Sequence, residues 1–199
     1  MAIESMANAF SLKGKTAIVT GGSRGIGLGI ATAMAQCGAD VAIFARNEEA
    51  GQKVVREFQE NYDGKFAFYK TDITDTQSAV ASVNACIRDF GSVDILVNNA
   101  GVGPMGGLLD QKEDLSGWLE CFDVDLHGAV RMCYLVARHM RDTGKGGRII
   151  NITSNAGEIV NLPFITAYAT AKAALNHFTR VVAAELAPLK IRVNAIAPG

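Results

Sequence analysis

The sequence predicts a doubly wound α/β fold, in which helices cover both faces of a parallel sheet. Short runs of β-branched residues alternate with longer segments of helical periodicity, which is the order expected of βαβ units. Segment 93–97 is almost wholly apolar, as in a strand that is covered on both faces. A glycine-rich turn follows the first apolar run and opens the first helical segment. The 199 residues suit one domain of this kind.

In the first half of the chain, capping residues and glycines mark the ends of the predicted elements. Asn47, followed by Glu48 and Glu49, suits the start of a helix. Asp75 suits the start of the next helix, and Gly38 stands where the first one is expected to end. The predicted strands are 16–20, 41–45, 65–69 and 93–97, and the predicted helices are 26–37, 47–62 and 75–90.

The second half contains two long helices and two further strands. Segment 116–140 is expected to be a helix that is irregular near Gly128, and 166–186 another that Pro188 ends. Residues 101–107 are expected to be a loop, and the predicted strands are 148–153 and 191–197. Ligands of such sheets bind outside the carboxyl ends of the strands, near the point where the strand order reverses.

Composition argues against several classes of partner and site. The formal net charge is -1 and Lys and Arg are scattered, so binding to nucleic acid or to an anionic membrane is not expected. Residues 1–12 include Glu4 and no long apolar run, so neither a signal peptide nor a spanning helix is expected, and a cytoplasmic location follows. The four cysteines form no CxxC pair and only three histidines accompany them, which predicts buried reduced thiols and no metal site. They are Cys37, Cys86, Cys121 and Cys133.

The turn at 20–27, with the sequence TGGSRGIG, has the properties of a dinucleotide-binding turn. Gly21 and Gly22 permit a tight turn and a close approach of the backbone to a ligand. Gly25 and Gly27 allow the helix to pack near the sheet and to direct its N-terminal amides at a pyrophosphate. A plain glycine turn is the alternative, but its place between a strand and a helix favours the cofactor. The residues predicted to bind it here are Gly21, Ser23, Arg24, Gly25, Ile26 and Gly27.

The end of the second predicted strand favours NADP(H) over NAD(H). An acidic side chain there would hydrogen-bond the ribose 2′-hydroxyl and repel a 2′-phosphate, but Ala45 and Arg46 occupy this end. Arg46 and Arg24 could flank a phosphate and bind it by charge-assisted hydrogen bonds. Solvated surface arginines are the alternative interpretation.

Tyr168 and Lys172 are four residues apart in a predicted helix, so their side chains lie one turn apart on one face. A phenol keeps its proton near neutral pH, and a nearby ammonium favours the phenolate. The pair can therefore donate and regain a proton, and Ser154 could offer a hydroxyl to the same reacting oxygen. Alone, this spacing also occurs on ordinary solvated helix faces.

Taken in order, the motifs resemble those of the short-chain dehydrogenase/reductase family, particularly 3-oxoacyl-acyl-carrier-protein reductases and related ketone reductases. The resemblance covers essentially the whole chain and implies a Rossmann-like fold. It rests on TGGSRGIG at 20–27, Thr71-Asp72-Ile73, Asn98-Asn99-Ala100-Gly101, Ile152-Thr153-Ser154 with Gly157, Tyr168 with Lys172, and segment 192–199.

The resemblance also implies roles for the site residues. In the reducing direction, nicotinamide would deliver hydride to a carbonyl carbon. Tyr168 would donate a proton to the oxygen of that carbonyl, while Ser154 hydrogen-bonds the same oxygen. Lys172 would lower the pKa of the phenol and hydrogen-bond the nicotinamide ribose. Asp72 matches the residue that holds the adenine ring. The cofactor contacts implied in this way are Asp72, Ile73, Asn99, Ala100, Gly101, Tyr168, Lys172, Pro198 and Gly199.

Three features depart from the family pattern. Asp125 stands where the family usually has the asparagine of its catalytic tetrad, and it is either a member of the proton relay or a structural helix residue. The interval from Ser154 to Tyr168 is longer than is common, so Asn155 is an alternative to Ser154. Members of the family continue beyond Gly199, so the domain 1–199 is expected to lack its final strand and to leave 191–197 as an exposed apolar edge.

The substrate is expected to be a small-molecule ketone or secondary alcohol of moderate polarity. The segments 102–109 and 155–164 that should line its pocket are largely apolar apart from Glu158 and Asn161. A 3-oxoacyl thioester, a sugar, a steroid and a small ketone all stay open as substrates.

Two alternatives concern assembly and activity. By resemblance, the helices at 116–140 and 166–186 would pair across subunits in a homotetramer or homodimer, although their apolar faces could equally be core within one chain. A regulatory or scaffold protein that binds NADP(H) without turnover is the alternative function. The intact Ser154, Tyr168 and Lys172 argue against it.

Overall fold

The computed structural model describes residues 10–160 and 162–199, and the predicted fold class is confirmed. Six parallel strands form one sheet in the order β3-β2-β1-β4-β5-β6. Because the order reverses between β1 and β4, the switch point of the sheet lies where these two strands pair. The strands are β1 (Thr16–Thr20), β2 (Asp40–Ala45), β3 (Phe66–Lys70), β4 (Ile95–Asn98), β5 (Gly147–Ile152) and β6 (Ile191–Ile196).

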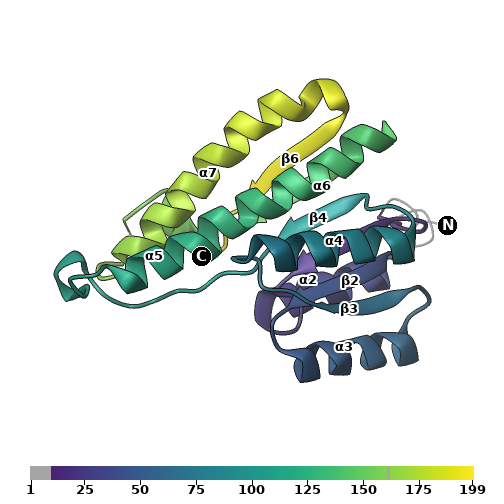
Figure 1. Cartoon of the computed structure of the whole chain (residues 1–199), viewed down its shortest axis with the longest axis horizontal. Helices are drawn as coiled ribbons and strands as arrows, with labels where there is room; N and C mark the ends of the chain where they lie inside the picture. Colours follow the sequence, from purple (N-terminus) through teal and green to yellow (C-terminus); the bar gives the residue numbers. More distant parts are fainter. Residues whose placement is uncertain (1–9, 161) are drawn as a thin grey trace.

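Helices cover both faces of the sheet, so that α3 and α4 lie on opposite sides of β3 (Figure 1). Strand β1 shows why: all its residues are buried, with Ile18 in one core cluster and Ala17 and Val19 in the other. One cluster packs under α2 (Gly25–Gln36) and α3 (Glu48–Asn61). The other packs under α4 (Thr76–Phe90), α6 (Ala129–Thr143) and α7 (Thr166–Leu186).

The predicted helix caps act as expected. The side chain of Asn47 accepts a hydrogen bond from the Ala50 N–H at the start of α3, and Asp75 accepts one from the Gln77 N–H at the start of α4. The described residues also include three short 3₁₀ turns: η1 (Leu108–Asp110), η3 (Asn155–Gly157) and η4 (Ala187–Leu189).

The segment predicted as one helix at 116–140 is built from three pieces. Helix α5 (Ser116–Phe122) leads into a π-helical turn, η2 (Asp123–Gly128), and α6 then continues to Thr143. A Cβ on Gly128 would lie 2.6 Å from the Ile73 Cδ1 atom, so glycine at the end of the turn lets α6 approach Ile73. A π-helical turn within a longer helix is frequent at functional sites, and this one contains Asp125.

Two predictions about exposure need correction. All four cysteines are free, but only Cys86, Cys121 and Cys133 are buried, and burial raises the pKa of their thiols to about 12, 11 and 12. Cys37 is half-exposed because it caps the C-terminus of α2.

Edge strand β6 is less apolar than expected, because exposed polar residues alternate with buried apolar ones in its first half. Ile191 and Val193 are buried, whereas Arg192 and Asn194 are exposed. Ile196 alone presents a large apolar side chain, which is 54% exposed.

Within ranges 10–160 and 162–199, no helix is long and apolar enough to cross a membrane. In the same ranges, no group of three or more His, Cys, Asp or Glu residues could hold a metal ion.

Candidate functional site

A cleft of about 540 Å³ opens at the carboxyl ends of the strands. Its walls come from the segments that follow β1, β2, β3 and β4, as expected of a ligand site at the switch point of an open α/β sheet. The predicted cofactor residues that it brings together are Gly21, Ser23, Arg24, Gly25, Ile26, Gly27, Arg46, Asp72, Ile73, Asn99, Ala100 and Gly101.

The glycine turn at the head of α2 fits a dinucleotide pyrophosphate. A Cβ on Gly27 would lie 2.3 Å from Asn99 Nδ2 and 2.4 Å from the Gly21 carbonyl oxygen, so this position excludes any side chain. Gly21 adopts a φ of +65°, and its Cβ would lie 3.0 Å from the Ala100 Cα atom. Helix α2 begins without a side-chain cap, which leaves its first backbone amides available to an anion.

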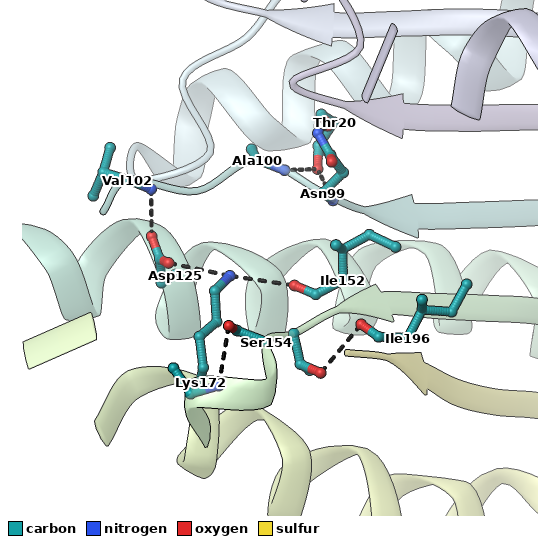
Figure 2. A network of polar contacts seen from close by, with 11 residues as sticks. Thr20, Asn99, Ala100, Val102, Asp125, Ile152, Ser154, Lys172 and Ile196 are labelled. Carbon is teal, nitrogen blue, oxygen red and sulfur yellow. Dashed lines mark hydrogen bonds and ion pairs between the residues drawn. The ribbon is translucent and has the colours of Figure 1, made fainter. Parts of the chain in front are cut away.

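Thr20 joins the glycine turn to the segment after β4, and the sequence analysis assigned no role to it. Its Oγ1 accepts hydrogen bonds from the Asn99 and Ala100 N–H groups at 3.0 Å (Figure 2). It also donates one to the Val97 carbonyl at 3.3 Å. Asn99 Nδ2 donates in return to the Thr20 carbonyl at 2.9 Å. A hydroxyl at the end of a fully buried strand is a signal for such a role, because a buried hydroxyl requires polar partners.

Three charged residues line the cleft, from the segments that follow β1, β2 and β3. Arg24 and Arg46 line it together with Asp72. Partial burial acts to raise the pKa of Asp72, but hydrogen bonds from the Thr74 hydroxyl and N–H outweigh this, and the charge of Arg46 adds to their effect, so the pKa falls below its usual value. Asp72 is therefore negatively charged near neutral pH, and its carboxylate is stabilised by the positive charge of Arg46.

Tyr168 and Lys172 lie together on one face of α7. The Nζ atom of Lys172 is 5.6 Å from the centroid of the Tyr168 ring, and it donates a hydrogen bond to the Ile152 carbonyl at 3.2 Å. Lys172 is buried and Tyr168 is half-buried. The ammonium is thus held beside the phenol by the end of β5.

Ser154 caps the η3 turn, where its Oγ accepts a hydrogen bond from the Ala156 N–H at 3.2 Å. A Cβ on Gly157 would lie 2.7 Å from the Lys172 carbonyl carbon and the Ala173 nitrogen, so glycine lets η3 pack directly on the backbone of α7. This contact between η3 and α7 places Ser154 close to Lys172 (Figure 2).

Asp125 occupies the π-helical turn and connects the two halves of the site. One carboxylate oxygen accepts a hydrogen bond from the Val102 N–H at 2.7 Å, and the other lies 3.1 Å from Lys172 Nζ (Figure 2). Burial raises the pKa of Asp125, while the charge of Lys172 and the Val102 hydrogen bond act in the opposite direction. A Cβ on Gly101 would lie 3.2 Å from Asp125 and 3.3 Å from Lys172 Nζ, so Gly101 is where the cleft reaches this pair.

The remaining predicted residues lie beside the cleft rather than in its walls. Tyr168, Lys172, Pro198 and Gly199 do not line it. The Pro198 carbonyl accepts a hydrogen bond from the Asn155 N–H at 2.9 Å, which places the segment 198–199 against η3. The cleft is also lined by residues that were not predicted to bind the cofactor: Phe44, Ala45, Asn47, Ala50, Thr71, Thr74, Val102 and Val124.

The two segments expected to line the substrate pocket are joined to each other. The Gly106 N–H donates to the Phe164 carbonyl at 2.7 Å, and Gly106 forms a parallel bridge with Ile165. The Glu158 carboxylate forms an ion pair with Arg180 of α7 at 3.0 Å, so its negative charge is paired with that guanidinium. Asn161 lies outside the described residues.

The family model described as short chain dehydrogenase matches residues 15–199. The chain belongs to this family. A sorbose reductase from Candida albicans is 39% identical over 191 residues, which are 96% of this chain and 67% of that protein. A 3-oxoacyl-[acyl-carrier-protein] reductase from Chlamydia muridarum is 37% identical over 188 residues, covering 94% of this chain and 74% of its own length.

Solved structures agree with this short-chain dehydrogenase assignment. A short-chain type dehydrogenase/reductase from Mycobacterium marinum superimposes with a TM-score of 0.92 at 37% identity, over 96% of this chain and 77% of that one. An NAD+-bound xylitol dehydrogenase superimposes with a TM-score of 0.88 at 34% identity, over 94% of this chain and 70% of that one. This protein is therefore an oxidoreductase of a family that uses NAD(P)(H).

Proposed function

We propose that this short-chain dehydrogenase interconverts a ketone and a secondary alcohol with NADP(H), and that residues 1–199 form a single dinucleotide-binding and catalytic domain. Tyr168 is the general acid of the reduction and the general base of the oxidation. The observation that carries the proposal is the buried Lys172 ammonium, 5.6 Å from the Tyr168 ring centroid and next to the wall residue Gly101.

The cleft would hold the dinucleotide along its length. The turn from Gly21 to Gly27 fits the pyrophosphate, and Asp72 with Ile73 flanks the adenine end. Asn99, Ala100 and Gly101 fit the nicotinamide half, next to Lys172, with Pro198 and Gly199 beside it. When bound, the cofactor supplies or accepts the hydride.

The proton is handled by this chain's own side chains. In reduction, the Tyr168 hydroxyl donates a proton to the oxygen on which negative charge develops, and Ser154 donates a hydrogen bond to the same oxygen. The positive charge of the Lys172 ammonium stabilises the phenolate that remains. In oxidation, the phenolate takes the proton back.

The preference for NADP(H) is supported by the two arginines of the cleft. Arg24 and Arg46 line it, and no acidic residue ends β2. The solved xylitol dehydrogenase was bound to NAD+, so relatives of this fold include enzymes that take the other cofactor.

Replacing Arg46 with aspartate tests this preference. We expect the ratio of kcat/KM for NADPH over that for NADH to fall by about 10- to 100-fold, because a charge-assisted hydrogen bond to phosphate is replaced by repulsion. The matched control is Arg56→Asp, which makes the same charge change at an exposed position of α3 outside the cleft and should leave the ratio within about twofold. An unchanged ratio in Arg46→Asp would contradict the assignment.

The substrate and the assembly extend the same proposal. A small carbonyl or alcohol substrate suits the apolar segments 102–109 and 155–164, whose exposed side chains include Leu109, Val160 and Phe164. A homodimer or homotetramer, and a cytoplasmic location, are parts of the proposal that rest on the sequence. Exposed apolar side chains on α5, α6 and α7 support pairing between copies: Leu119, Tyr134 and Val181.

The function is tested by following NADPH absorbance with a panel of ketones, sugars and 3-oxoacyl thioesters. We expect steady consumption of NADPH with at least one of these classes and the reverse reaction with the corresponding alcohol and NADP+. Binding of NADPH without turnover of any member would instead support the regulatory or scaffold alternative.

A further inference from the structure

We propose that Asp125 is a charged positioning residue. Its carboxylate forms an ion pair with the Lys172 ammonium, offsets that positive charge and thereby sets the pH range in which Tyr168 exchanges its proton. The inference rests on the proposed function and deepens it, because it concerns the same site. The ammonium beside the phenol is then one half of an internal ion pair rather than an isolated cation.

The geometry of the pair is that of a shielded ionic contact. Asp125 Oδ2 and Lys172 Nζ are 3.1 Å apart, and the two side chains are 0% and 5% exposed. The other carboxylate oxygen, Oδ1, accepts the Val102 N–H at 2.7 Å, and Lys172 donates to the Ile152 carbonyl. Because water is excluded, the charge of Asp125 acts on Lys172 with little screening.

The donors around Asp125 favour the carboxylate over both the neutral acid and an amide. Oδ1 accepts a hydrogen bond from the Val102 N–H, and Oδ2 makes an ionic contact with the Lys172 ammonium but no hydrogen bond to a described residue. The ammonium favours the ionised carboxylate, whereas the amide of an asparagine would have no charge and would turn its NH₂ group towards one of these two donors. The negative charge of Asp125 therefore contributes to its complementarity with the Val102 N–H and the Lys172 ammonium.

Other groups that act on the pair come from the elements packed around it. Tyr168 on α7 and the thiol of Cys121 on α5 are titratable, and burial raises the pKa of that thiol to about 11, so it is neutral in the working range. Strand β5 contributes the Ile152 carbonyl. On the solvent side of the π-helical turn, Asp123 and His127 pair with each other at 2.8 Å and are more than half exposed.

The consequence for the phenol has a definite sign. An isolated ammonium stabilises the Tyr168 phenolate more than an ammonium whose charge is offset by a carboxylate. Replacing Asp125 with asparagine removes the offset and should favour the phenolate over the phenol. Oxidation needs the phenolate and reduction needs the phenol. The limb of the pH–rate profile that Tyr168 controls should therefore move to lower pH in the oxidation and also in the reduction.

The experiment is the pH profile of kcat/KM in both directions for the wild type and for Asp125→Asn. We expect the acidic limb of oxidation and the alkaline limb of reduction both to move down by about one pH unit. The matched control is Asp123→Asn, which removes an exposed carboxylate from the same turn and should leave both limbs unchanged. Unchanged limbs in Asp125→Asn, or limbs that move to higher pH, would overturn the proposal.

A second measurement needs neither a variant nor a substrate. In wild-type protein labelled with ¹³C at the aspartate carboxyl carbons, the assigned Asp125 resonance should report the ionised form at neutral pH. A neutral acid at that pH would overturn the ion pair even if Asp125→Asn does not fold. If no ketone is turned over, the proposed function fails, while this titration still decides the state of Asp125.

Discussion

Replacing Tyr168 with phenylalanine is expected to lower kcat by about 100- to 10,000-fold while NADPH affinity stays within a few-fold of the wild type. The change removes one oxygen from a half-buried ring that lies 5.6 Å from Lys172 Nζ, so the packing of α7 is retained while the proton donor is lost. The measurements are initial rates with the best ketone of the panel and a fluorescence titration with NADPH.

The control for this variant is Tyr62→Phe. Tyr62 follows α3 and packs its ring against Phe58, outside the cleft, so loss of its hydroxyl should leave kcat unchanged. A Tyr168→Phe enzyme that keeps its full kcat would show that the proton comes from another group, and the proposed mechanism would be wrong.

Replacing Gly27 with alanine is expected to reduce the free energy of unfolding by about 1–3 kcal/mol and to weaken NADPH binding at least about tenfold. The new methyl carbon would lie 2.4 Å from the Gly21 carbonyl oxygen and 2.3 Å from Asn99 Nδ2. Since one of these atoms is backbone, the glycine turn and the segment after β4 must separate to make room. Urea unfolding and a fluorescence titration measure the two effects.

Gly29→Ala is the matched control, because it makes the same substitution in the same helix two residues further on. Nothing lies within 4 Å of a Cβ at this exposed position, and alanine favours the helix by up to about 1 kcal/mol. We expect an unchanged or slightly raised unfolding midpoint and unchanged NADPH affinity. Equal losses in both variants would mean that the contact of Gly27 with Gly21 and Asn99 is not what the cofactor site depends on.

Much of the fold was predictable because the signals that specify it are local. Apolar strand residues alternate with helical segments, and the caps Asn47 and Asp75 act within a few residues of their own positions. The segment 116–140 was predicted only in outline. Its π-helical turn was not predicted, and the close approach of Gly128 to Ile73 joins residues that are distant in sequence, so no local pattern indicates it.

The site was predictable where a motif is contiguous and not where it is assembled across the chain. The glycine turn contributes consecutive residues to the cleft. By contrast, the pairing of Asp125 with Lys172 requires the π-helical turn, the segment after β4 and α7 to meet, and Thr20 gains its partners only when β1 and β4 pair. The partial exposure of Cys37 was missed although the end of its helix was predicted, because apolar neighbours in sequence do not show which side chains pack against a residue in space.

The bridge between Gly106 and Ile165, with the hydrogen bond from Gly106 to Phe164, joins the loop after β4 to the loop after η3. A bulky substituent that pushes the loop after η3 outwards must either break this bridge or carry the loop after β4 with it. That second loop is anchored at Val102 to Asp125, and Asp125 in turn touches Lys172. If the proposed function holds, a substrate that displaces either loop would also disturb the contact between Asp125 and Lys172.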